Sequence, residues 1–281
     1  MNETRKSAGK VGLAKASSGV EPQEMLETLR QQMRRIETAQ RPADESRVSS
    51  GCVALDRLLP GGGFGRGTLV EWLSDGIGHG AGTLALVAAR QAVGGGANAG
   101  QSDADRAFCS ARGAIVIVDD RETFYPPAAV QLGIDLEQVI VLRAAGLRER
   151  QWAWDQALRC PGVAVVWGHV ERLDDRWFRR WQLAVEAGGG IGFLLRSTRM
   201  RGRPSWADVQ LVAQPLPSQG DRRWRIEVTR ARGGPAGGAV ELEMDEVTAT
   251  LREASRSDEP RSLSMAAELA RATSGRRSAR A

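Results

Sequence analysis

Cysteine and histidine are scarce in this sequence. Its three cysteines, Cys52, Cys109 and Cys160, are widely spaced without a CxxC pair, and the two histidines, His79 and His169, lie far from any cysteine cluster. An odd number of scattered cysteines is typical of a reducing compartment and supplies no disulfide framework. Zinc sites gather several Cys or His ligands at short spacing, which is absent here. We therefore expect a cytoplasmic protein without a bound metal.

Long apolar runs are also missing. No stretch approaches the ~20 apolar residues that a membrane-spanning helix needs, and the N-terminal MNETRKSAGKVGLAKASSG lacks the apolar core of a secretory signal. The sequence is instead rich in glycine, with 33 residues, and 42% of it is hydrophobic. These numbers predict many tight turns and a sizeable core. The formal net charge of +5 permits contact with nucleic acid or an acidic partner.

The chain divides into a central α/β region and flanking segments. Residues 1–20 are basic and poor in hydrophobes, which predicts a disordered arm. Residues 21–46 read as an amphipathic helix followed by a linker. Residues 47–250 form the core, and residues 251–281 form a tail with a short helix at 262–271 and four arginines near its end.

The N-terminal helix carries one apolar stripe. Met25, Leu29, Met33 and Ile36 recur at spacings of four, four and three, which places them on one helical face. Because this helix lies outside the α/β pattern, the stripe needs a partner. Packing on its own domain and docking on another chain, or on a second copy, both remain open.

Strand and helix patterns alternate from about residue 67 to residue 198. Strands are expected at 68–73, 114–120, 138–143, 162–168 and 191–198, and helices at 83–93, 125–133, 147–160 and 174–188. The alternation predicts a mostly parallel, twisted sheet flanked by helices. The β-branched run AIVIV favours a strand buried on both faces. Segments 206–216, 222–232 and 239–245 are expected as short antiparallel strands at one edge.

A glycine-rich stretch, GIGHGAGT, lies between the first of these strands and the following helix. Its loop positions are Gly76, Gly78, Gly80, Ala81, Gly82 and Thr83. A phosphate-binding loop occupies such a junction, where backbone N–H groups, a lysine and a hydroxyl hold phosphate and Mg²⁺. The lysine is absent here. The stretch is either a residual nucleotide or anion site at a helix N-terminus, or simply a turn.

The order of these segments resembles the RecA core. VSSGCVALDRLLPGGGFGRGTLVEWL resembles the lead-in to the RecA phosphate loop. AIVIVDDRETFYPPAAVQLGIDLEQVIVLR resembles its second strand and the approach to the third, GVAVVWGHVERL its aspartate-bearing strand, and FLLRSTRMR the strand before its second DNA-binding loop. The resemblance covers about residues 47–245 and implies a RecA-like fold.

The same resemblance implies that phosphoryl-transfer residues are missing. Ala81 falls at the family's lysine and Gly82 at its Mg²⁺-binding hydroxyl; a slip that restores Thr83 as the hydroxyl places Gly82 at the lysine. Three further positions are altered: Gly168 at the metal ligand, Arg121 at the water-activating glutamate and Ser197 at the γ-phosphate-sensing glutamine. Without these groups little electrostatic stabilisation remains, and ATPase activity is not expected. An offset of one residue would restore an acid from Asp119, Asp120 or Glu122.

Two arginine-rich stretches are candidate contact surfaces. In RSTRMRGRPSW, the residues Arg196, Arg199, Arg201, Arg203 and Trp206 combine phosphate-binding cations with a stacking ring, which suits DNA or a protein partner. In the helix at 174–188, Trp177, Trp181 and Leu183 have the spacing of core contacts, with the arginines on a solvated face. A second basic surface there is the alternative.

ALDRLLPGGGFGRGTLVEWL, RGRPSWADVQLVAQPL and IEVTRARGGPAGGAVELEMD are similar to the ImuA family, RecA-related accessory proteins of bacterial mutagenesis cassettes. This resemblance implies a non-catalytic scaffold in SOS-induced translesion DNA synthesis, without a cofactor. It implies an inactive Y-family-like polymerase (ImuB) and an error-prone DnaE-type polymerase as partners, with single-stranded DNA or RecA as further candidates. The alternatives are a diverged DNA-dependent ATPase and a regulator that binds RecA filaments.

Overall fold

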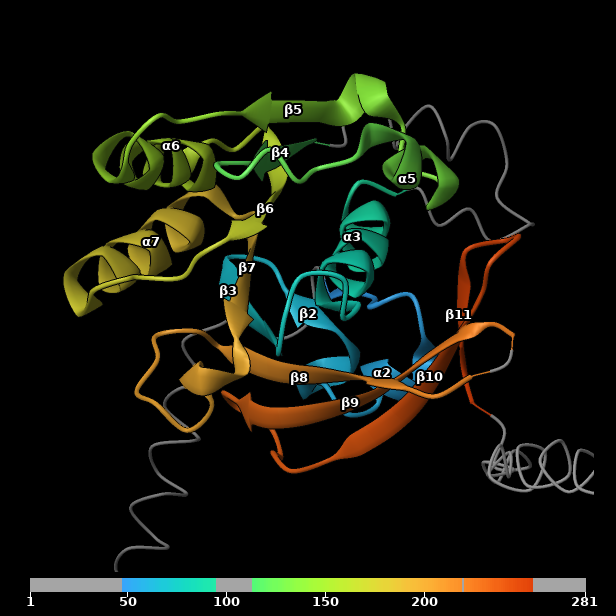
Figure 1. The fold of residues 1–281 in the computed structure, drawn as a ribbon. Coiled ribbons are helices and arrows are strands. Elements are labelled where there is room, and N and C mark those ends of the chain that lie inside the picture. The colour runs from blue at the N-terminus through green and yellow to red at the C-terminus, as the bar shows by residue number, and fades with distance from the viewer. Residues whose placement is uncertain (1–46, 95–112, 219, 255–281) are drawn as a thin grey trace, which may run out of the picture. The chain divides into compact units, whose positions relative to one another are not determined.

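The computed structural model describes residues 47–94, 113–218 and 220–254, which build a large mixed sheet with helices on both faces (Figure 1). The strands of this sheet are β3 (Thr68–Ser74), β4 (Ala114–Val118), β5 (Val139–Leu142), β6 (Val163–His169), β7 (Ile191–Ser197), β8 (Val209–Leu216), β9 (Arg222–Ala231), β10 (Ala239–Asp245) and β11 (Thr250–Glu253). Their spatial order is β11-β10-β9-β8-β3-β7-β6-β4-β5. Separately, β1 (Arg47–Val48) and β2 (Phe64–Gly65) form a short antiparallel pair.

The parallel sheet expected from the alternating pattern is confirmed. Six strands pair in parallel with one another, in the order β8, β3, β7, β6, β4 and β5. Strands β9, β10 and β11 extend the sheet in antiparallel fashion at one edge. The prediction for segment 206–216 is wrong in one respect. Strand β8 is antiparallel only to β9, because its other edge pairs in parallel with β3. An apolar pattern fixes which faces of a strand are buried, but not the direction of its neighbours.

Helices cover the two faces of the sheet separately. Helices α2 (Val53–Asp56), α3 (Ala81–Ala92) and α5 (Pro126–Gln131) contribute to the hydrophobic cluster on one face. Helices α6 (Leu147–Arg159) and α7 (Asp175–Gly188) pack on the other. Figure 1 shows α3 and α5 on one side of the parallel strands and the α6–α7 pair on the opposite side. These are called the α3 face and the α6/α7 face below. Short 3-10 turns are η1 (Pro60–Gly62), η3 (Leu136–Gln138) and η4 (Thr198–Met200).

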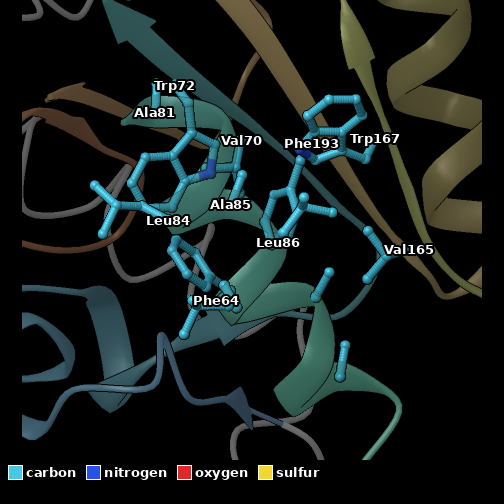
Figure 2. Packing of buried hydrophobic residues seen from close by; sticks show 14 of the residues in the cluster. Phe64, Val70, Trp72, Ala81, Leu84, Ala85, Leu86, Val165, Trp167 and Phe193 are labelled. Atoms are coloured by element: carbon cyan, nitrogen blue, oxygen red, sulfur yellow. The ribbon is translucent and has the colours of Figure 1, made fainter. Parts of the chain in front are cut away.

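The α3 face holds the larger core. Figure 2 shows Phe64, Trp72 and Phe193 gathered beside Leu84 and Ala85 of α3. The rings of Phe64 and Phe193 have centroids 5.5 Å apart in an edge-to-face arrangement, a geometry that aromatic quadrupoles favour. This packing fixes α3 against β3 and β7, and therefore fixes the glycine-rich loop that joins β3 to α3.

The α6/α7 face is closed by tryptophan packing. Trp154 of α6 and Trp181 of α7 stack with ring centroids 4.9 Å apart, and both are buried. Helix α7 begins as predicted, because the Asp174 carboxylate accepts a hydrogen bond from the Trp177 backbone N–H at 2.8 Å.

Several expectations lie outside the described residues. They include the arm at 1–20, the helix at 262–271 and the apolar stripe of the N-terminal helix, Met25, Leu29, Met33 and Ile36. Strand β11 runs through residues 250–253 and so extends the sheet into the segment expected as tail. Within the described ranges, no helix has the length and apolar character to cross a bilayer.

Candidate functional site

The glycine-rich loop connects the end of β3 to the start of α3 and is stabilised by contacts within the chain. The Ser74 hydroxyl donates to the Gly76 carbonyl at 3.1 Å, and the Thr198 hydroxyl donates to the Asp75 carboxylate. Gly80 is the N-cap of α3, has left-handed backbone geometry (φ 94°) and provides no side chain to cap the helix. The loop therefore has the strand–turn–helix geometry of a phosphate loop, but it contains no lysine or arginine.

The position expected for the lysine belongs to the protein core. Ala81 is 3% exposed and shares the α3-face cluster with Trp72 and Leu84, beside which Figure 2 shows it. A Cβ added at Gly82 would lie 3.3 Å from Trp167 Cζ2 and 3.5 Å from Leu195 Cδ1. Neither residue at the start of α3 provides a side-chain group for phosphate or Mg²⁺, and a longer side chain at either would meet apolar neighbours.

The assignment of Gly168 to the metal-ligand position requires correction. A Cβ added at Gly168 would lie 2.5 Å from the Val118 carbonyl and 3.1 Å from Trp154 Cζ2, so this residue faces α6 and not the loop. Side chains alternate along a strand, and the preceding residue, Trp167, therefore points to α3. Its indole Nε1 donates to the Gly82 carbonyl at 3.4 Å. A bulky indole thus occupies the loop-facing position of β6.

At the end of β4, Arg121 and the two acids before it take part in local structure, whereas Glu122 is exposed. Arg121 forms an ion pair with Glu171. The Asp119 carboxylate accepts hydrogen bonds from the backbone N–H groups of Thr123 at 2.9 Å and Phe124 at 3.1 Å, which caps the turn after β4. Asp120 pairs with Arg150. Both acids that precede Arg121 are therefore engaged in local structure.

Other residues of this region also have structural roles. Burial and the nearby Arg121 charge lower the pKa of His169, although adjacent carboxylates oppose the shift. This shift favours the neutral imidazole. Ser197, expected at the sensor position, is exposed, and its hydroxyl accepts a hydrogen bond from the Arg199 backbone N–H at 3.3 Å. The described residues contain no group of three or more His, Cys, Asp or Glu side chains placed to hold a metal ion.

Arg196 was expected on a contact surface, but it is buried. Its guanidinium bonds the Glu71 carboxylate at 2.5 Å and the Val170 carbonyl at 3.2 Å, and its side chain is 2% exposed. Glu71 also accepts hydrogen bonds from Ser205 Oγ at 2.9 Å and Gln210 Nε2 at 2.8 Å. Arg196 therefore neutralises a buried carboxylate on the α6/α7 face and is unable to reach a ligand in solution.

The other residues of the arginine loop lie on the surface. Arg199, Arg201 and Arg203 are exposed, and Trp206 retains 42% of its surface. Arg201 pairs with Glu227 of β9 at 2.6 Å. The structure also brings Arg179 of α7 to this surface, with its guanidinium carbon 4.9 Å from the Trp206 ring centroid. Arg179 and Trp206 belong to two different arginine-rich stretches of the sequence. The spacing of residues in either stretch does not predict their contact. We call Arg179, Arg199, Arg203 and Trp206 the arginine–tryptophan surface.

Helix α7 is divided between core and solvent. The core interpretation is confirmed for Trp181, which is 2% exposed, whereas Trp177 is only half-buried. For Leu183 the interpretation is wrong, because 46% of its surface is exposed. Arg180 bonds both oxygens of the buried Asp155 at 2.9 Å, and Arg159 bonds them at 3.2 and 3.3 Å. Burial raises the pKa of Asp155. The two arginines together lower this pKa by more than burial raises it, so the net shift is downward.

Comparison with solved structures defines the fold class. A crystal structure of the RadB recombinase matches 74% of this chain and all of its own chain, with a TM-score of 0.56 and 17% sequence identity. At this identity the likeness concerns the fold alone, and it establishes a RecA/RadB-like architecture. No family model matches the sequence.

Sequence comparison leads to a particular family. Proteins named Protein ImuA from two strains of Caulobacter vibrioides are 32% identical to this chain over 145 residues. The match covers 46% of this chain and 59% of each relative, less than two thirds of the curated relatives' length. These relatives carry the name of the family that the sequence motifs also resemble, and the similarity extends over about half of the chain.

Proposed function

We propose that this protein is a RecA-like accessory scaffold in SOS-induced translesion DNA synthesis, which organises partner proteins without hydrolysing ATP. The partners in this proposal are an ImuB-type polymerase-like protein and a DnaE-type error-prone polymerase, in the cytoplasm. Similarity to proteins named ImuA supports the accessory role. The observation that carries its non-catalytic character is the position of Ala81, buried in the apolar core where the family resemblance expects a lysine.

The electrostatics of the loop support this proposal. Phosphoryl transfer requires preorganised positive charge around the transferred group. At the loop, the β6 position facing α3 is an indole, and Arg121 is neutralised by Glu171. The backbone N–H groups at the start of α3 remain a weak source of positive potential. Residual anion binding at these groups is compatible with the absence of ATP hydrolysis.

The arginine–tryptophan surface supports contact with single-stranded DNA or a protein partner. It combines exposed guanidinium groups with a partly exposed indole, and such a combination binds phosphate and stacks on bases. The fold places this surface at the end of β7 and the start of the segment leading to β8. In this proposal it orients the scaffold at damaged DNA, while the apolar stripe of the N-terminal helix recruits protein.

Two measurements on the full chain test the proposal. Phosphate release from ATP–Mg²⁺, with and without single-stranded DNA, should stay at background. Copurification should recover both polymerase-type partners, and deletion of residues 1–40 should abolish this association. Turnover above background would favour the diverged ATPase. Recovery of RecA without a polymerase subunit would favour the filament regulator, and unchanged pulldown and sedimentation after the deletion would exclude the N-terminal helix as the docking element.

A further inference from the structure

The glycine-rich loop contacts a residue that the sequence analysis did not connect with it. Trp224, in the antiparallel strand β9, is 3% exposed and belongs to the same α3-face cluster as Ala81 and Leu84. A Cβ added at Gly80 would overlap Trp224 Nε1 and lie 2.5 Å from Cε2 and 2.6 Å from Cδ1. The indole therefore lies directly against the α-carbon of Gly80, at the point where α3 begins.

Two independent physical demands require glycine at position 80. The first is the left-handed backbone, with φ 94°, which disfavours any side chain. The second is the space taken by the Trp224 indole. Gly78, two residues earlier, has a similar φ of 88°, but an added Cβ there would have no atom within 4 Å. At Gly80, both the left-handed backbone and the neighbouring indole therefore disfavour a side chain. At Gly78, only the left-handed backbone does.

The position of Trp224 is itself well determined. Its backbone pairs with Leu242 on one side and Pro215 on the other, in the middle of the antiparallel extension. Arg222 lies with its guanidinium carbon 5.8 Å from the indole centroid, and its Nε is 3.2 Å from the Glu246 carboxylate. The sheet therefore holds the indole in place, and the loop packs against a rigid surface.

We propose that Trp224 orders the glycine-rich loop in place of a bound phosphate group. Glycine-rich loops at helix N-termini usually gain order when their N–H groups close around an anion. Here the N-cap has no side-chain hydrogen bond, and the start of α3 is fixed by the indole of Trp224 at Gly80 and that of Trp167 at Gly82. The loop is consequently ordered without ligand, and this ordering couples α3 to the antiparallel strands.

A double-mutant cycle on the full chain, measured by urea unfolding, tests the contact. Gly78→Ala should raise the unfolding equilibrium constant by about tenfold, because only left-handed strain is added. Gly80→Ala should raise it by about a hundredfold or more, because strain and overlap with the indole combine. In the Trp224→Ala background, Gly80→Ala should cost only the same roughly tenfold factor as Gly78→Ala. An equal cost of Gly80→Ala in both backgrounds would overturn the proposal. Trp224→Leu replaces Trp224→Ala in the cycle should the alanine variant not fold.

Hydrogen exchange of the amides at residues 75–84 gives a local measurement. We expect slow exchange in the wild type without ligand, no further slowing with ATP–Mg²⁺, and faster exchange in Trp224→Leu. Marked slowing by ATP–Mg²⁺ in the wild type would mean that a nucleotide, and not the indole, orders the loop. These outcomes are distinct from those of the scaffold proposal, which the phosphate-release and copurification measurements decide independently.

Discussion

The glycine-rich loop and the arginine–tryptophan surface follow neighbouring parallel strands, yet they differ in charge. The loop after β3 leads into α3 through Ala81, an apolar position that is 3% exposed. The segment after β7 has exposed arginines beside a tryptophan that retains 42% of its surface. β3 and β7 pair in parallel, so both segments leave the same edge of the sheet. Positive charge is therefore concentrated where an extended partner can reach it, and is absent where a nucleotide would require it.

Arg196 shows that being in the arginine-rich stretch does not by itself make an arginine exposed. It lies in β7 only three residues before Arg199, yet it is buried against Glu71. Strand alternation turns it to the α6/α7 face, where a carboxylate from β3 neutralises it. In this basic stretch the arginine within β7 is buried, and the arginines after the strand has ended are exposed.

The largest expected effect concerns restoration of the missing lysine. Ala81→Lys should destabilise the protein by about 3–5 kcal/mol, because a cation and extra volume enter a packed apolar cluster. It should not create ATPase activity. Ile77→Lys adds the same charge in the same loop at a side chain that is 58% exposed, and should change stability by about 0.5 kcal/mol or less. Urea unfolding measures the stability of both variants. If Ala81→Lys were as stable as the wild type and released phosphate from ATP, the loop would differ from the arginine–tryptophan surface only by one missing lysine.

A loss of stability of similar size is expected when the buried ion pair between Arg196 and Glu71 is broken. Arg196→Met should cost about 3–5 kcal/mol, because Glu71 would remain buried without its cation. The matched substitution Arg199→Met, at an exposed position of the adjoining loop, should cost about 0.5 kcal/mol or less. The double variant Glu71→Leu with Arg196→Met should recover part of the loss. Equal effects of the two arginine substitutions would contradict the burial of Arg196.

A smaller effect is expected from acidification. Because the net shift lowers the pKa of Asp155 in the folded protein, its ion pairs stabilise the fold above the ordinary aspartate pKa. This stabilisation should be lost as the pH falls through the lowered folded-state pKa. Asp155→Asn should cost about 1–3 kcal/mol at pH 7, and the difference between wild type and variant should shrink under acidic conditions. Unfolding curves at several pH values test this; a gap that is constant down to the most acidic pH would show that Asp155 makes no such contribution.

The smallest effect on stability concerns the arginine–tryptophan surface, where the substitutions are expected to change binding and not folding. If single-stranded DNA binds there, replacing Arg199 and Arg203 with alanine should reduce the salt dependence of binding by ~0.7 in the log–log slope for each lost phosphate contact. Trp206→Ala should weaken binding by about 1–3 kcal/mol through lost stacking. Arg252→Ala is the control, because Arg252 is paired with Asp221 and Glu243. Identical salt slopes for all variants would move the DNA contact elsewhere.

Much of the fold could be predicted because its signals are local. Alternating strand and helix patterns located the parallel strands, and the missing lysine was visible in GIGHGAGT itself. The candidate site was less predictable. Gly168 and Trp167 are adjacent in sequence, and only the pairing of β6 with β4 and β7 decides which of them faces α3. The contact of Arg179 with Trp206 depends on how α7 packs, and no periodic pattern in the sequence predicts it.

The sequence by itself determined the element order, the buried character of the central strands and the lack of a lysine in the loop, because propensity, hydrophobic period and residue identity act over short distances. Only the tertiary structure decided that Arg196 would pair with Glu71, 125 residues away, and that the Trp224 indole would lie against Gly80. Such contacts join strands that become neighbours only when the sheet assembles. A single strand's pattern specifies its two faces, but what covers each face is set by the rest of the fold.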